Sequence, residues 1–349
     1  MYKSLFRPVL FKMKPERAQE VSKFFLKRRS LWRPVSSFMH VKEEEMLRTN
    51  FAGIPLKNPV GLAAGFDKYC EMIGTMMELG FGYAVSGSIV YGARDDNPKP
   101  MYVRYPEKES LVNCTGIPSK GIDYALKGLM QYTNRKTPII ANVQDFDIDG
   151  YLNGFKAVQP LVDAVEIGLI CPNEKYEGCN PIEEETFDQI LTQLKPKKSK
   201  PILVKIRNYH NEKERENRFE LIRMCMKHDV DGITLPGSMS VKEPKLSLGA
   251  GNLTGRAIFH NTLRNIHDVW DQTNGKVPIK ALGGIFRGKD AFEAIKAGAT
   301  TVESVTGMIY EGWSYAKQIN SELVNLLKEN KFSSLDELRG YANPQVAAA

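Results

Sequence analysis

Eight short runs of mostly apolar residues, with helix-like stretches between most of them, constrain the fold of this chain more than any other feature. Parallel strands that are covered on both faces have this nearly continuous apolar character. Helix-like stretches at 286–297 and 313–328 follow the last two runs. Eight β-then-α repeats predict an α/β fold, a closed (β/α)8 TIM barrel, rather than an open doubly wound sheet. The runs span 60–65, 83–89, 139–143, 164–169, 202–206, 232–237, 279–284 and 301–307.

The length and composition fit one such barrel with additions. The chain has 349 residues, and a (β/α)8 barrel takes roughly 250. No apolar run approaches the roughly 20 residues that span a bilayer. The first eleven residues are broken by Lys3, Arg7 and Pro8, so we expect no signal peptide. We predict a two-helix amphipathic extension at 1–40 and a catalytic barrel at 41–349.

The first 40 residues carry nearly all of the net charge. They hold ten Lys or Arg residues and two acidic residues, a balance of +8, so the rest of the chain is near −1 within the total of +7. Two apolar stripes there have helical spacing, Leu5/Val9 and Val21/Phe25. A short basic amphipathic segment is typical of a membrane-surface element, although a helical cap packed on the barrel fits the same pattern. Because the barrel itself is not basic, we expect no nucleic-acid partner.

The cysteines indicate a reducing compartment. Their number is odd and their spacing matches no zinc site, so we expect neither a disulfide framework nor a bound metal. Together with the basic extension, this predicts a cytoplasmic protein that lies peripherally on the inner face of the cell membrane. The five cysteines are Cys70, Cys114, Cys171, Cys179 and Cys225.

Residues at the C-terminal ends of the strands are the candidate site residues, because the active site of a (β/α)8 barrel lies there. Ala63 and Ala64 end the first run, and small residues let a flat ligand lie against the backbone. Lys68 follows them and adds a cation. Lys205 lies inside an apolar run, where a charge is costly unless it is paired.

Glycine-containing turns follow the last three runs and predict a phosphate site. Bare backbone amides at the last loops of a barrel form the common phosphate site of this fold. The turn at 251–255 adds further amides. The candidate residues are Gly255, Gly283, Gly284, Thr306 and Gly307.

Cys171 is the candidate general base. It stands in a Cys-Pro-Asn turn at the end of the fourth run. A free cysteine is often only a small buried hydrophobe. A thiol with a reference pKa of roughly 8.5 can, however, take a proton from carbon where nearby cations favour its thiolate.

Several stretches resemble the signatures of the dihydroorotate dehydrogenase family. The segment Asn-Pro-Val-Gly-Leu-Ala-Ala-Gly-Phe-Asp-Lys at 58–68 resembles the opening signature. Asn113 with Gly116, and the stretches at 97–100, 204–206 and 281–285, are similar to other motifs of the family. The stretch at 14–18 resembles the membrane-associated, quinone-using branch, whereas the tail at 331–338 resembles the soluble branch.

The resemblance implies an FMN-dependent oxidoreductase acting on CH–CH bonds, which oxidises dihydroorotate to orotate in pyrimidine biosynthesis with a quinone as electron acceptor. It implies that Cys171 is the base, a position where the soluble branch has Cys and the membrane branch Ser. It places the substrate against Lys68, Asn113, Asn173 and Ser238. It places FMN against Ala63, Ala64, Ser88, Asn142, Lys205, Gly255, Gly283, Gly284, Thr306 and Gly307.

Three departures from the family pattern leave a second hypothesis open. Gly168 and Gly237 stand where the family has asparagines that bind the pyrimidine ring, and Ile117 replaces a phenylalanine. Each lost partner costs about 1–3 kcal/mol. The alternative is an FMN-dependent ene-reductase or dehydrogenase of the same family that acts on a less polar, enone-type substrate. A non-catalytic flavin-binding protein is disfavoured because Lys68 and Cys171 are retained.

Overall fold

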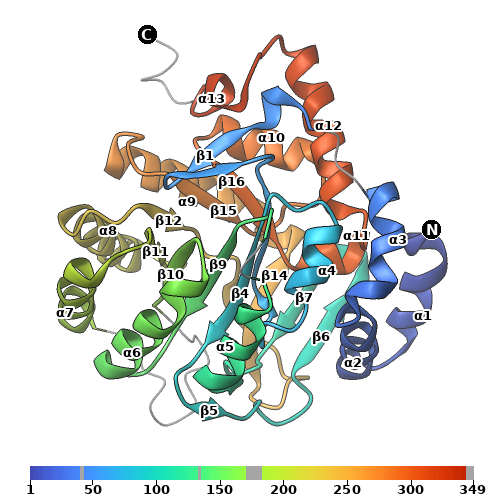
Figure 1. Cartoon of the computed structure of the whole chain (residues 1–349), viewed down its shortest axis with the longest axis horizontal. Helices are drawn as coiled ribbons and strands as arrows, with labels where there is room; N and C mark the ends of the chain where they lie inside the picture. The colour runs from blue at the N-terminus through green and yellow to red at the C-terminus, as the bar shows by residue number, and fades with distance from the viewer. Residues whose placement is uncertain (40–42, 133–134, 170–182, 343–349) are drawn as a thin grey trace.

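A closed barrel of eight parallel strands forms the centre of the molecule (Figure 1). The computed structural model describes residues 1–39, 43–132, 135–169 and 183–342. The strands are hydrogen-bonded in the order β10-β11-β12-β15-β16-β3-β4-β9, and β9 closes on β10. This confirms the predicted TIM barrel. The strands are β3 Val60–Asp67, β4 Tyr83–Ile89, β9 Ile139–Val143, β10 Ala164–Gly168, β11 Ile202–Lys205, β12 Gly232–Thr234, β15 Ile279–Leu282 and β16 Thr301–Ser304.

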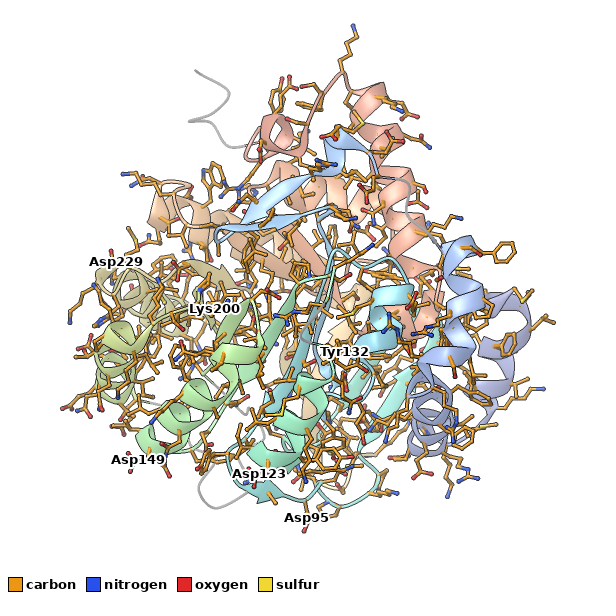
Figure 2. All side chains as sticks on the ribbon, in the orientation of Figure 1. Asp95, Asp123, Tyr132, Asp149, Lys200 and Asp229 are labelled. Atoms are coloured by element: carbon orange, nitrogen blue, oxygen red, sulfur yellow. The ribbon has the colours of Figure 1, made fainter. Side chains whose placement is uncertain are left out.

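Outer helices cover the barrel, and many of their charged side chains face outward. Asp123, Asp149 and Asp229 are exposed on or beside these helices and point away from the barrel in Figure 2. Asp147 caps α6 by accepting from the amide of Gly150 at 2.7 Å, a common way to satisfy a free N–H at a helix start. The helices are α4 Ile73–Glu78, α5 Ile122–Met130, α6 Ile148–Val158, α7 Glu184–Leu194, α8 Glu212–Lys227, α9 Phe259–Thr273, α10 Gly288–Lys296, α11 Thr306–Glu311, α12 Tyr315–Glu329 and α13 Leu335–Leu338.

Additional strands close the two ends of the barrel. The hairpin of β1 Thr49–Phe51 and β2 Ile54–Leu56 packs Phe51 against Tyr83 and Leu203 in one buried cluster. A four-stranded antiparallel sheet, ordered β13-β14-β7-β6, is built from loops at the other end. Its strands are β6 Tyr102–Tyr105, β7 Ser110–Asn113, β13 Met239–Lys242 and β14 Ala250–Gly255, and β5 Ala93–Arg94 pairs with β8 Ser119–Lys120.

The N-terminal extension holds one more helix than the two predicted from the sequence. It contains η1 Tyr2–Phe6 continuing into α1 Arg7–Lys12, then α2 Pro15–Leu26 and α3 Arg29–Met39. The basic run after Leu26 ends α2, as expected, but a new helix begins directly behind it and tolerates Pro34 in its interior. The two predicted helices are present as α1 and α2, and α3 was not predicted.

The extension packs on the barrel as well as facing outward. The rings of Tyr2, Phe6 and Trp32 meet Trp313 edge-on at 5.3, 5.0 and 5.7 Å between centroids. Figure 1 shows α1, α2 and α3 beside β6, α4 and α11. No helix in the described parts of the chain is long and apolar enough to cross a membrane.

Candidate active site

A cavity of about 2020 Å³ opens at the C-terminal ends of the barrel strands and extends beneath the N-terminal helices. Residues from many separate segments meet in its wall, because all eight parallel strands end on the same side of the barrel. The sequence-predicted residues that line it are Ala64, Lys68, Ser88, Asn113, Asn142, Lys205, Ser238, Gly255, Gly283, Gly284 and Thr306.

Two other predicted residues, among those that the structure describes, are not found in this wall. Ala63 is fully buried behind it, since it alternates with Ala64 along β3. Gly307 already uses its amide, which donates to the Ser304 hydroxyl at 2.8 Å. Cys171 and Asn173 lie outside the described residues. The candidate base and one candidate substrate ligand therefore stay predictions.

Three glycines form one end of the cavity where no side chain fits. Gly255, Gly283 and Gly284 all have positive φ, at 101°, 112° and 74°. A Cβ at Gly284 would lie 2.5 Å from the Cβ of Phe259, and one at Gly283 would lie 2.6 Å from Ile258 Cδ1. Thr306 adds a hydroxyl that is 2.9 Å from the Thr254 hydroxyl. Exposed backbone amides and hydroxyls in a concave turn suit a phosphate group.

Polar side chains from β4, β9 and β11 form the next part of the wall. The Ser88 hydroxyl donates to Gln144 Oε1 at 3.3 Å, and Lys205 stands at the end of β11. The side-chain oxygen Oδ1 of Asn142 is buried and has no hydrogen-bond partner among the described residues. A buried acceptor without a partner is costly, so this wall fits a ligand that brings a hydrogen-bond donor.

Two features at or behind this wall were not predicted from the sequence. Gln144 follows Asn142 at the strand spacing of two, which places both side chains on the same face and was a usable signal. Behind Asn142, the barrel interior holds a buried ionic cluster of Glu166, Lys280 and Glu303. Each of these residues stands inside an apolar run, the signal that singled out Lys205.

Lys68 reaches the cavity from a turn that Asp67 holds in place. The Asp67 carboxylate accepts the amides of Glu71 and Met72 at 2.9 and 2.8 Å. Burial raises the pKa of Asp67 to about 6, even though both amide hydrogen bonds favour the ionised form. Asn113, at the end of β7, donates to the Asn252 carbonyl at 3.3 Å, which fixes it opposite β14.

Neither glycine at a family asparagine position has free space around it. A Cβ at Gly237 would lie 2.4 Å from Leu282 Cγ, and a Cβ at Gly168 would lie 3.2 Å from both Asn142 Nδ2 and Gln144 Oε1. Leu282 and Gln144 therefore occupy part of the volume that an asparagine side chain would need. Ile117 lines the cavity at a φ of 55°, an uncommon conformation for a β-branched residue.

The far part of the cavity is apolar and lies under the extension. Leu10, Val21 and Phe25 are among the residues that line it. Arg104 of β6 is a polar element there and donates to the Leu10 carbonyl at 3.1 Å. The Tyr2 hydroxyl donates to the Ile309 carbonyl at 2.7 Å, which closes the extension onto α11.

Comparisons with known proteins agree with this architecture. Residues 46–327 match the family described as dihydroorotate dehydrogenase. A protein named dihydroorotate dehydrogenase (quinone) from Sulfurimonas denitrificans is 31% identical, covering 97% of this chain and 98% of that protein. One of the same name from Roseiflexus sp. is 28% identical, covering 97% of each.

A solved structure supports the fold. The ligand-free dihydroorotate dehydrogenase of Eimeria tenella superimposes with a TM-score of 0.83 at 24% identity, covering 95% of this chain and 99% of that one. The complex of the Eimeria tenella enzyme with ferulenol gives a TM-score of 0.81. The family match and the 31% identical relative together cover the barrel and the extension. The chain belongs to the dihydroorotate dehydrogenase family, oxidoreductases that act on a CH–CH bond.

Proposed function

We propose that this protein oxidises dihydroorotate to orotate with FMN as cofactor and passes the electrons to a quinone. The observation that carries the proposal is the continuity of the cavity. One space joins the glycine-walled barrel mouth to an apolar region beneath a basic, amphipathic extension. The curated relatives carry names that specify a quinone.

The cavity wall supports FMN as the cofactor. Gly255, Gly283 and Gly284, with Thr306, would hold the phosphate. Asn142 and Lys205, with Ala64 and Ser88, would hold the ring system and ribityl chain. Bound flavin supplies a two-electron acceptor at this place. The unpartnered Asn142 side-chain oxygen fits this assignment, because the oxidised flavin ring carries an N–H group that can donate a hydrogen bond.

The chain's own residues would bind the substrate and move its proton. Lys68 supplies a cation for the substrate carboxylate, and Asn113 and Ser238 supply polar groups for the ring. Asn173, which lies outside the described residues, would add a further polar group. Cys171 would take a proton from one ring carbon onto its sulfur while the neighbouring carbon gives up its hydride. Lys68 and Lys205 line the cavity, and in this proposal their positive charges would favour the thiolate that this step requires.

The extension supports the quinone and membrane parts of the proposal. Leu5, Val9 and Phe38 are 61%, 57% and 73% exposed, unusually high for apolar side chains. Such a face, on a segment with a charge of +8, is typical of contact with an anionic membrane surface. A quinone dissolved in the bilayer would then reach the apolar end of the cavity. We therefore place the protein peripherally on the inner face of the cell membrane.

A second candidate keeps FMN and Cys171 but changes the substrate. Gly168, Gly237 and Ile117 all line the cavity and present no polar side chain to a ligand ring. Leu282 and Gln144 fill the space beside the two glycines. The apolar side chains of Leu282, beside Gly237, and of Ile117 support a less polar, enone-type substrate, or its saturated form, as the second candidate.

Anaerobic reduction of the bound flavin tests both candidates. Purified protein is mixed with dihydroorotate or with a panel of saturated carbonyl compounds, and loss of flavin absorbance is followed. A water-soluble quinone is then added to test reoxidation. Fast reduction by dihydroorotate supports the proposed activity. Slow reduction by dihydroorotate, with fast reduction by a less polar compound, refutes it in favour of the second candidate.

A further inference from the structure

A buried ionic cluster lies in the barrel interior directly behind the proposed flavin wall. Lys280 Nζ is 2.7 Å from Glu166 Oε2 and 2.8 Å from Glu303 Oε1. All three side chains are at most 1% exposed. Thr234, the register neighbour of both Lys205 and Lys280, donates its hydroxyl to Glu166. The cluster therefore extends from the middle of the barrel to the strand end that carries Lys205.

Glu166 is the member of this cluster that touches the cavity wall. Its Oε1 accepts a hydrogen bond from Asn142 Nδ2 at 2.7 Å, and the two residues are register neighbours on β10 and β9. Burial raises the pKa of Glu166, but the charges of Lys280 and Lys205 outweigh burial and hold this pKa well below its usual range. Glu166, with the Lys280 ammonium 2.7 Å away, is therefore ionised near neutral pH.

The charge of Glu166 dictates which way the Asn142 amide points. A carboxylate can only accept hydrogen bonds, whereas an amide has one donor end and one acceptor end. Asn142 must therefore present its NH2 group to Glu166. Its carbonyl oxygen is left on the other side, buried and without a partner among the described residues.

We infer that Glu166 is a positioning residue, which locks Asn142 as a hydrogen-bond acceptor for an N–H donor of the bound cofactor. The inference rests on the proposed function, because it takes FMN as the ligand of this wall. Glu303 has no such role. It contacts the same lysine but, among the described residues, no hydrogen bond joins it to Asn142.

Replacing Glu166 with glutamine should reverse the Asn142 amide. The Lys280 ammonium would attract the oxygen of the new glutamine, so the glutamine NH2 would turn toward Asn142. Asn142 would then present its oxygen to that NH2 and its own NH2 to the ligand. Two donors, one on Asn142 and one on the flavin, would face each other, and the hydrogen bond would be lost.

Two matched variants separate positioning from simple destabilisation. Glu166→Gln and Glu303→Gln each remove one carboxylate from Lys280, but only the first touches Asn142. The flavin is removed from each protein, and the dissociation constant of FMN is measured by quenching of flavin fluorescence. We expect E166Q to raise it roughly tenfold, which corresponds to one hydrogen bond. E303Q should raise it less than about threefold, because Asn142 keeps its orientation.

A second background makes the test independent of how well E166Q folds. In Asn142→Ala, no side-chain amide is left for residue 166 to orient. Adding E166Q to this background therefore changes no hydrogen bond between residue 142 and the ligand. E166Q should weaken FMN binding roughly tenfold in the native background and by less than about threefold in the N142A background. Thermal melts of all variants show that each one is folded.

The outcomes are distinct. A loss of FMN affinity on E166Q that is present in the native background and absent in the N142A background, with a small effect of E303Q, supports the positioning role. Equal losses from E166Q in both backgrounds, or equal losses in E166Q and E303Q, overturn it and leave Glu166 a purely structural residue. Native protein that binds no FMN overturns the proposed function, and this inference falls with it.

Discussion

Removal of the Lys280 charge should destabilise the fold in a way that depends on pH. Lys280→Met keeps a side chain of similar length but leaves Glu166 and Glu303 without their shared cation. Removing one partner of a buried ion pair costs about 3–5 kcal/mol, because the remaining charge is buried and unpaired. With an unfolding entropy of roughly 2.1 cal/mol/K per residue, this corresponds to a drop in Tm of about 4–7 °C for a chain of this size.

The sign of the pH dependence follows from the carboxylates. In the native protein the pKa of Glu166 is lowered by Lys280, so its contribution to stability is present above the unfolded pKa of about 4.3 and is lost as pH falls below it. Without Lys280, both buried carboxylates have raised pKa values, and their ionisation destabilises the fold as pH rises above about 4.3. The gap in Tm between the two proteins should be widest near neutral pH and narrow toward pH 4.

Differential scanning calorimetry from pH 4 to pH 8 measures this gap. Lys213→Met, at an exposed position on α8, is the matched control and should leave Tm unchanged. A triple variant that adds Glu166→Gln and Glu303→Gln to Lys280→Met should recover most of the loss at neutral pH, because no buried charge remains. A gap that is constant with pH, or absent, would refute the assignment of these residues as a buried ionic cluster.

Three further predictions concern the site and the extension. Cys171→Ala should keep the bound flavin, but substrate should no longer reduce that flavin. Cys171→Ser should keep part of the rate of flavin reduction, with a pH optimum at higher pH, because a hydroxyl is a weaker acid than a thiol. Full activity in the alanine variant would place the base elsewhere. The double variant Leu5→Glu with Val9→Glu should no longer bind anionic liposomes, and its Tm should be unchanged because both side chains are exposed. The control variant Met226→Glu, at an exposed position on α8, should bind the liposomes as the native protein does. Gly237→Asn should lower Tm and fail to speed flavin reduction by dihydroorotate, because its Cβ would lie 2.4 Å from Leu282 Cγ and overpacking costs about 1–3 kcal/mol; faster reduction would show that Leu282 moves aside.

The sequence predicted the barrel well because buried parallel strands have a strong local signature. The ranges of β4 and β9 match the expected runs residue for residue. The run at 232–237 overshot β12, which ends at Thr234, because small and apolar residues continue into the cavity wall beyond it. The run at 301–307 overshot β16 because Thr306 begins α11. Apolar character identifies a strand but does not mark its end when the following loop also faces a buried cavity.

Features that depend on long-range pairing were not predictable in the same way. The sheet of β13, β14, β7 and β6 joins segments from two distant loops, and each strand alone is too short to show a pattern. The ionic cluster of Glu166, Lys280 and Glu303 was also not predictable, because each buried charge is compensated only by charges on other strands. A lysine in an apolar run was singled out at Lys205, but only the three-dimensional arrangement shows that the barrel interior holds a matched set.

The four-stranded sheet restricts how the chain can change in length. Asn113 pairs in register with Asn252 on one side and with Tyr102 on the other. Insertion or deletion of one residue within β7 would turn every following side chain to the opposite face and would remove Asn113 from the cavity. Arg104 of β6 holds the Leu10 carbonyl of the extension, so a slip in that strand would also release the N-terminal helices. Changes of length can therefore accumulate only in the connecting loops, and the proposed substrate and quinone regions of the cavity must evolve with one shared register.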